Sequence, residues 1–215
     1  MHIPDGFLAA PTWTSTWLFS IAGISVCLKK VTMVLEDRII PLMGVMAAFI
    51  FAAQMLNFPV AGGTSGHLLG GALAAVLLGP YAGAVVIAIV LIVQCLVFQD
   101  GGLTALGANI FNISFIGAGG GYIIYRCIAR IKNDRRGVII GAAVAAWLSV
   151  VIASFACAVE LALSGTSPFR IVVPAMLGVH ILIGIGEAVI TTGVVSFVLK
   201  VRPDLIYCPK KEECQ

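Results

Sequence analysis

Residues 67–98, HLLGGALAAVLLGPYAGAVVIAIVLIVQCLVF, decide how often this chain crosses a membrane. The stretch contains no Asp, Glu, Lys or Arg, and its strongest turn signal is the dipeptide Gly79-Pro80. It fits either one long helix or two shorter spans that meet at this dipeptide. The choice between them sets the side of the membrane on which every later loop lies.

The distribution of lysine and arginine favours two spans. If residues 67–98 cross twice, twelve of the thirteen Lys and Arg residues lie on one side and only Arg170 lies on the other. If the stretch crosses once, every later loop changes side and the split falls to nine against four. Cytoplasmic loops of membrane proteins carry an excess of Lys and Arg. The sequence therefore predicts an N-terminus outside the cell and a C-terminal tail, residues 200–215, in the cytoplasm.

The composition excludes a soluble domain. Hydrophobic residues make up 60% of the chain and charged residues 11%, whereas charged residues approach a quarter of a typical soluble domain. We expect a single all-α membrane domain over residues 1–215, surrounded by lipid and without a nucleic-acid partner. Seven transmembrane helices are predicted, namely the two halves of 67–98 and the spans 13–28, 39–56, 103–125, 137–163 and 172–199.

The N-terminal segment, residues 1–8 (Met1-His2-Ile3-Pro4-Asp5-Gly6-Phe7-Leu8), offers three nitrogens for a metal ion. They are the α-amine of Met1 and the amide nitrogen and Nδ1 of His2, which together close fused five- and six-membered chelate rings. Fused rings of this kind favour a planar, all-nitrogen arrangement. That arrangement suits Ni(II) or Cu(II), whereas structural zinc prefers a tetrahedron. A histidine at position 2 also occurs by chance, so the motif alone does not establish a site.

His67 can supply a fourth nitrogen. It follows Thr64-Ser65-Gly66 and is expected to open a helix, where a hydrogen bond to a backbone carbonyl is its ordinary role. The predicted topology, however, places His67 on the same outer side as Met1 and His2, so the four nitrogens can complete a square. Glycines at positions 62, 63 and 66 would let the loop backbone approach closely.

Four polar residues are expected to support this site from outside the ligand set. Asp5 is the best candidate, because a ligating imidazole usually donates its other N–H to a carboxylate, carbonyl or water. Ser65 lies in the loop that carries His67. Asn109 and Asn112 share one helix face and either orient loop groups or bridge helices.

Three ionisable residues fall inside the predicted spans. His180 is a further candidate near the site, for which a structural hydrogen bond is favoured over ligation. Glu160 and Glu187 are expected to be protonated or paired, because an ionisable group in a membrane is costly and usually faces the bundle interior.

Small residues cluster on the span that follows His67. Gly70, Gly71, Ala74 and Ala75 form overlapping pairs of the kind that permit close helix contact. We predict contact with a partner subunit here, and packing within the bundle is the alternative.

No enzymatic motif is present: HExxH, the P-loop and Gly-x-Ser-x-Gly are all absent from the sequence. Cys208 and Cys214, in the polar tail, lack the CxxC spacing of a zinc knuckle and are expected to be reduced thiols. The sequence thus favours a transport or binding role over catalysis.

The N-terminal segment and the stretch GGTSGHLLGG at residues 62–71 together resemble the metal-binding M-components (CbiM/NikM) of energy-coupling-factor (ECF) cobalt and nickel transporters. The resemblance covers the chain in length and span count. It implies an S-component-like bundle with an extra N-terminal helix, metal ligands at Met1, His2 and His67, and a location in a prokaryotic cell (inner) membrane. It also implies a transmembrane T-component, two ATPase subunits and a small N-type membrane subunit, which we expect to be a separate chain.

Two functions remain open at this stage. The favoured one is the metal-capturing subunit of an ATP-driven importer, with Ni(II) as the transported substrate and Co(II) as the runner-up. The other is a secondary transporter or channel that works alone. It would need a proton path, for which only Glu160 and Glu187 lie in the spans.

Overall fold

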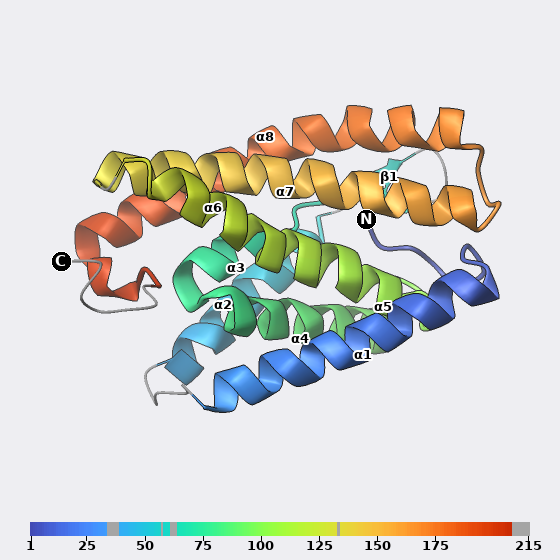
Figure 1. The fold of residues 1–215 in the computed structure, drawn as a ribbon, viewed down its shortest axis with the longest axis horizontal. Helices are drawn as coiled ribbons and strands as arrows, with labels where there is room; N and C mark the ends of the chain where they lie inside the picture. The colour runs from blue at the N-terminus through green and yellow to red at the C-terminus, as the bar shows by residue number, and fades with distance from the viewer. Residues whose placement is uncertain (34–38, 57, 61–63, 133, 208–215) are drawn as a thin grey trace.

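The computed structural model describes residues 1–33, 39–56, 58–60, 64–132 and 134–207 and is largely helical (Figure 1). Its helices, in chain order, are α1 (Ala10–Thr32), α2 (Ile39–Gln54), α3 (Gly71–Leu78), α4 (Pro80–Phe98), α5 (Leu106–Asn109), the π-helix η1 (Ile110–Gly120), α6 (Gly121–Ala129), α7 (Arg135–Leu163), α8 (Phe169–Val201) and the 3-10 turn η2 (Pro203–Leu205). α5, η1 and α6 follow one another without a gap and form one helix. With that helix counted once and η2 left aside, these ranges contain seven helical segments, as many as the predicted spans.

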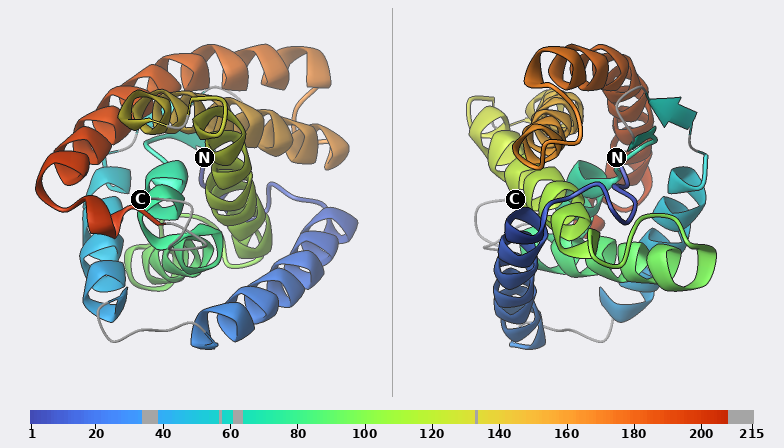
Figure 2. Two further views of the ribbon diagram at one scale, coloured as in Figure 1. Left: turned by 60° about the vertical axis from the view of Figure 1, so that its left-hand side comes forward. Right: turned by 90° about the vertical axis from the view of Figure 1, so that its right-hand side faces the viewer.

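The helices pack around an interior that the first residues of the chain enter. α7 packs against α8 and α6, while α4 packs against α1, α2, α3 and η1. α7 and α8 run side by side in opposite directions (Figure 1). In both views of Figure 2 the N-terminus lies among the helices instead of extending away from them.

The predicted break at Gly79-Pro80 is confirmed. α3 ends at Leu78 and α4 begins at Pro80, because Pro fits the first turn of a helix and Gly79 takes a left-handed backbone with φ of 83°. A side chain at Gly79 would collide with the ring of Tyr207, whose backbone N–H donates to the carbonyl of Val76. The turn is therefore packed against the segment that follows α8.

The prediction that His67 opens a helix is wrong. Residues 67–70 are not helical, and α3 starts only at Gly71. Gly70 stands at its N-terminal end with φ of 72°, a conformation that a residue with a side chain rarely adopts. α3 has eight residues and is therefore about 12 Å long, far less than the ~30 Å of a bilayer core. Residues 67–70, called the strap below, join β2 to α3 in non-helical backbone.

A short hairpin precedes the strap, and the all-α prediction did not include it. β1 (Phe58–Val60) pairs antiparallel with β2 (Thr64–Gly66), with Phe58 opposite Gly66. Pairing satisfies backbone groups of a glycine-rich loop that has no charged side chain to hold it. The predicted contribution of Gly62 and Gly63 lies outside the described residues.

Helix length and composition agree with the membrane prediction in part. Among the described residues, α4, α7 and α8 are long and apolar enough to span a membrane, and α2 is a shorter apolar helix. The side of the membrane on which each terminus lies stays a prediction.

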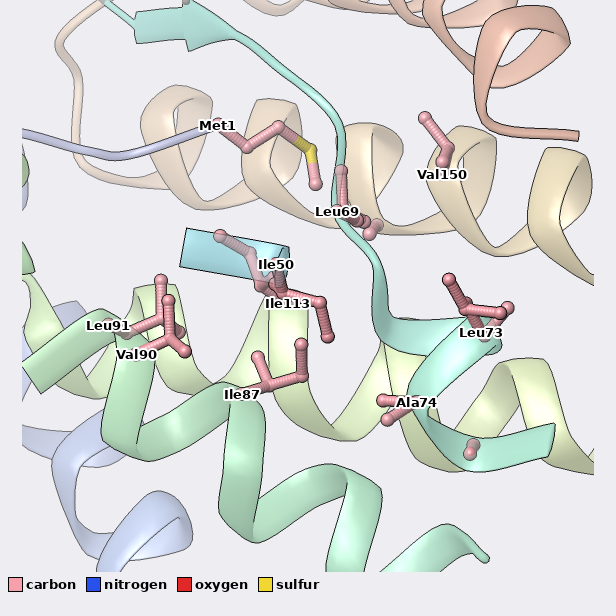
Figure 3. Close-up of a cluster of buried hydrophobic side chains, with 14 of the residues drawn as sticks. Met1, Ile50, Leu69, Leu73, Ala74, Ile87, Val90, Leu91, Ile113 and Val150 are labelled. Atoms are coloured by element: carbon pink, nitrogen blue, oxygen red, sulfur yellow. The ribbon is translucent and has the colours of Figure 1, made fainter. Parts of the chain in front are cut away.

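The small residues predicted to meet a partner instead face the interior. Ala74 and Ala75 are fully buried, and every residue of α3 is buried. A Cβ at Gly71 would lie 2.6 Å from the backbone carbon of Gly117 in η1, so the two helices touch backbone to backbone. Figure 3 shows Ala74 and Leu73 among the buried core side chains, together with Met1. The alternative of contact within the bundle is thus the one realised.

Candidate metal site

The N-terminal segment is part of the core. Met1 and Ile3 are completely buried and His2 is 4% exposed. Asn109 binds Ile3 at two points: Oδ1 accepts the backbone N–H of Ile3 at 2.8 Å, and Nδ2 donates to its carbonyl at 3.2 Å. Gly102 donates its N–H to the same carbonyl at 2.8 Å. Asn109 thus orients the backbone of Ile3, which corresponds to one of the two roles predicted for it, the orientation of loop groups.

His2 and His67 meet as predicted. Their rings stack with centroids 4.4 Å apart and an interplanar angle of 15°. Nδ1 of His67 lies 2.6 Å from the carbonyl oxygen of Leu68. A carbonyl can only accept, so Nδ1 carries the proton and Nε2 keeps its lone pair. Nε2 of His67 is buried without a hydrogen-bond partner, which is the state of an imidazole ready to bind an ion.

Asp100 is the carboxylate beside the site. Its Oδ1 lies 3.2 Å from Nδ1 of His2, and its side chain is 18% exposed. Burial lowers the pKa of His2, and the hydrogen bond that His2 donates to the Asp100 carboxylate partly opposes that shift. Sequence reasoning missed this residue and had assigned the role to Asp5.

Asp5 has a different task, so the prediction for it is wrong. Its carboxylate accepts the backbone N–H groups of Leu103 and Thr104, at 3.1 and 2.7 Å, and the Thr104 hydroxyl at 2.5 Å. The hydrogen bonds from Thr104 are the main reason that the pKa of Asp5 is lowered. Asp5 therefore ties the N-terminal segment to the turn after α4.

Asn112 realises the other role predicted for the asparagine pair. Its Nδ2 donates to a carboxylate oxygen of Glu160 on α7 at 2.6 Å, so it bridges two helices. Glu160 is accordingly paired, one of the two states expected for it.

Glu187 and Gln54 hold the strap. The two carboxylate oxygens of Glu187 accept the backbone N–H groups of Leu69 and Gly70, at 2.6 and 2.8 Å. Nε2 of Gln54 donates to the carbonyl of Leu69 at 2.7 Å. These bonds satisfy backbone groups of the strap that no helix or sheet pairs, as buried backbone requires.

His180 makes the structural hydrogen bond that was favoured for it. Nδ1 lies 2.8 Å from the carbonyl of Met176, one turn earlier on α8, and the ring is fully buried. Its Nε2 has no hydrogen-bond partner. The amino group of Met1 interacts electrostatically with both His180 and His67, so His180 belongs to the surroundings of the site.

The α-amine of Met1 is poised for coordination. Burial lowers its pKa to about 5, from an ordinary value of 8.0. The amine is therefore neutral at pH 7, the form that can donate a lone pair to a metal ion. The side chain of Ser65, the remaining predicted neighbour, lies outside the described part.

Conventional ligand clusters do not offer a rival site. No group of three or more His, Cys, Asp or Glu side chains within the described ranges is arranged to hold a metal ion. The candidate site draws instead on the amine, the amide and two imidazoles, whose nitrogen donors suit Ni(II), Cu(II) and related ions more than Mg²⁺ or Ca²⁺.

Comparison with known proteins gives concordant matches. Residues 2–205 match the family model CbiM, described as the cobalt uptake substrate-specific transmembrane region. A protein of Archaeoglobus fulgidus that carries the name fused nickel transport protein NikMN is 43% identical over 208 residues, which cover 96% of this chain and 68% of that protein. The cobalt transport protein CbiM of Acetoanaerobium sticklandii is 35% identical over 159 residues, which cover 72% of this chain and 64% of that protein. A crystal structure of a truncated transition metal transporter superposes with a TM-score of 0.87 at 34% identity, covering 93% of this chain and 99% of that one.

Proposed function

This chain belongs to the CbiM family of nickel and cobalt transport proteins, and from that premise we propose that it is the subunit that captures Ni(II) for an ATP-driven importer of the ECF type. It is a transport protein and not an enzyme. The observation that carries the proposal is the stack of His2 on His67 beside the buried amine of Met1.

The ion is proposed to bind four nitrogens in one plane. Met1 supplies its amine, His2 its amide nitrogen and Nδ1, and His67 its Nε2. Nδ1 of His2 faces Asp100 at 3.2 Å when no metal is bound. Binding therefore requires the tautomer of His2 that carries its proton on Nε2, which leaves the Nδ1 lone pair for the ion. The two histidine rings turn from face-to-face contact so that their nitrogens point at one centre.

Asp100 is proposed to balance the charge of the loaded site. A divalent ion bound to one deprotonated amide nitrogen keeps one net positive charge. A buried charge of this kind is costly without a partner, and the Asp100 carboxylate is beside His2. The same carboxylate attracts a cation before it binds.

Nickel is proposed over cobalt because a planar nitrogen square suits Ni(II). Relatives of this chain carry names of both kinds, with nickel in the Archaeoglobus protein and cobalt in the Acetoanaerobium protein. The preference therefore rests on the donor set and not on the names.

Energy is proposed to come from other subunits, a T-component, two ATPases and a small N-type protein, at the inner membrane of a prokaryotic cell. A stand-alone transporter would need carboxylates free to carry protons. Glu160 is bonded to Asn112, and Glu187 to the strap. With α3 turned inward, the partner contact is proposed instead at exposed basic residues near the inner membrane face, including Lys29, Lys30 and Arg130.

Metal content and competition binding test this function. Full-length chain with an unmodified Met1 should copurify with or bind one nickel ion, and nickel should outcompete cobalt under reducing conditions. Cobalt held far more tightly than nickel would reverse the order of metals. No binding of either metal would contradict the proposed function.

A further inference from the structure

Glu187 and His67 are linked through a single peptide group. The carbonyl of Leu68 accepts the Nδ1 proton of His67 at 2.6 Å. The amide nitrogen on the other side of that same peptide bond belongs to Leu69, and its N–H donates to Glu187 at 2.6 Å. The carboxylate, the peptide and the imidazole thus form one chain of hydrogen bonds that ends at Nε2 of His67.

We propose that Glu187 is a positioning residue for the metal site, acting on Nε2 of His67 through the peptide between Leu68 and Leu69. The inference rests on the proposed function, because it takes His67 as a ligand. In many metal sites a carboxylate contacts the distal N–H of a ligating histidine directly and thereby fixes the ring and raises its basicity. Here the peptide group between Leu68 and Leu69 lies between the Glu187 carboxylate and the His67 ring. Because this group is planar and polar, it transmits both the orientation of the ring and the increase in its basicity.

The geometry of the peptide accounts for the orienting effect. A peptide group is planar and trans, so holding its N–H in one direction holds its C=O in the opposite direction. Glu187 fixes the direction of the Leu69 N–H, and the Leu68 C=O on the same peptide is thereby fixed as well. The His67 ring must then lie so that its Nδ1–H points at that carbonyl oxygen. Hydrogen bonds in such a chain also polarise one another, which increases electron density on the ring and at Nε2.

The strap is secured from a second side. Gln54 on α2 donates to the carbonyl of Leu69, while Glu187 on α8 accepts from the N–H of Leu69. Both backbone groups of one residue are thereby bound by side chains of two different helices. All of these groups are buried: Gln54 is 0% exposed and Glu187 is 1% exposed.

A purely structural role for Glu187 predicts a different outcome from the positioning role. If the carboxylate only satisfies the backbone of the strap, its replacement changes stability but leaves the ligand field of the bound ion unchanged. If it positions His67, the coordination of the ion changes as well. The spectrum of bound nickel separates the two roles.

The test compares Glu187→Gln with Thr191→Val in full-length chain with a native N-terminus. Glutamine keeps one acceptor oxygen and places an NH₂ donor against a backbone N–H. Thr191 lies one turn further along α8 and is equally buried, which makes it a matched control. Calorimetry gives the nickel affinity, X-ray absorption counts imidazole ligands, and thermal unfolding without nickel reports stability.

Glu187→Gln is expected to weaken nickel binding 10- to 100-fold, the usual range for an outer partner of a metal ligand, and to weaken the imidazole signal of His67 in the X-ray absorption spectrum without abolishing it. Thr191→Val should retain wild-type affinity and spectrum. If Glu187→Gln does not fold, Gln54→Leu replaces it, with the same expectations. Wild-type coordination in the folded variant, or equal weakening in the control, overturns the inference. Failure of the wild-type chain to bind nickel overturns the proposed function instead.

Discussion

Asp100 places a carboxylate oxygen 3.2 Å from Nδ1 of His2. The contact joins the N-terminal segment to the residues just after α4, where Gly101 also approaches His2 closely. A negative charge thus lies beside the imidazole that is proposed to bind the ion.

Asp100→Asn is predicted to weaken nickel binding by about 10- to 100-fold. The variant keeps a hydrogen-bond acceptor near His2 but removes the charge that balances the loaded site. Calorimetry measures the effect. Asp204→Asn is the control, because that carboxylate is exposed and paired with Arg202. Tighter binding by Asp100→Asn would mean that the carboxylate competes with the ion.

One residue added before Met1 is predicted to abolish binding. The addition turns the amine into an amide, and the complete burial of Met1 leaves no room for it. Elemental analysis of purified protein with and without the extra residue provides the measurement. A tag on the C-terminal tail should leave binding intact. An extended chain that binds nickel normally would rule out the amine as a ligand.

His67→Ala should lose nearly all nickel affinity, whereas His180→Ala should keep most of it. His67 carries a buried Nε2 lone pair against His2, while His180 is held to Met176 within its own helix. Parallel titrations of the two variants test the difference. Equal losses would place His180 among the ligands.

The fall of nickel affinity with pH is predicted to steepen as the pH drops through about 5, in addition to the gradual decline that release of the His2 amide proton causes over the whole range. The sign follows from burial, which lowers the pKa of the Met1 amine to about 5. Protons therefore compete for the amine only below that value, and not near the ordinary 7.7–8.0. Affinity measured across this range checks the prediction. Release of a second proton on binding between pH 8 and pH 7, in addition to the amide proton, would contradict it.

Gly71→Leu is predicted to destabilise the fold by about 1–3 kcal/mol or more. A side chain there meets the backbone of Gly117, which cannot move aside like a flexible side chain. Thermal unfolding of the metal-free chain reports the loss. Gly193→Leu is the control, because a Cβ at Gly193 meets no atom within 4 Å. Unchanged stability of Gly71→Leu would return this surface to the candidates for partner contact.

The sequence was sufficient for the number of helical segments and for the placement of His67 near His2. Hydrophobic length and basic loops indicate spans without reference to tertiary structure, and the break at Gly79-Pro80 is a local signal. The position of His67 beside His2 followed from topology, because both fall on one side of the membrane in the predicted order.

The strap could not be predicted in the same way. Leu68 and Leu69 are apolar and lead towards α3, so local propensity favours helix. Two distant side chains, Glu187 and Gln54, override that preference by binding the backbone directly. Asp100, in contrast, could have been proposed from the sequence as the carboxylate near His2, because it and Asp5 are the two carboxylates in the predicted outer connections. The choice of Asp5 relied on its closeness in sequence to His2, which does not determine contact in space.

The anchoring of Ile3 by Asn109 bears on the order in which the molecule is assembled. These two residues are separated by 106 positions, so the segment that is synthesised first binds to a helix that is completed much later. Long-range contacts of this kind are formed slowly, because a long chain must be closed before they stabilise anything. The contact between Ile3 and Asn109 can therefore form only after about half of the chain has been synthesised.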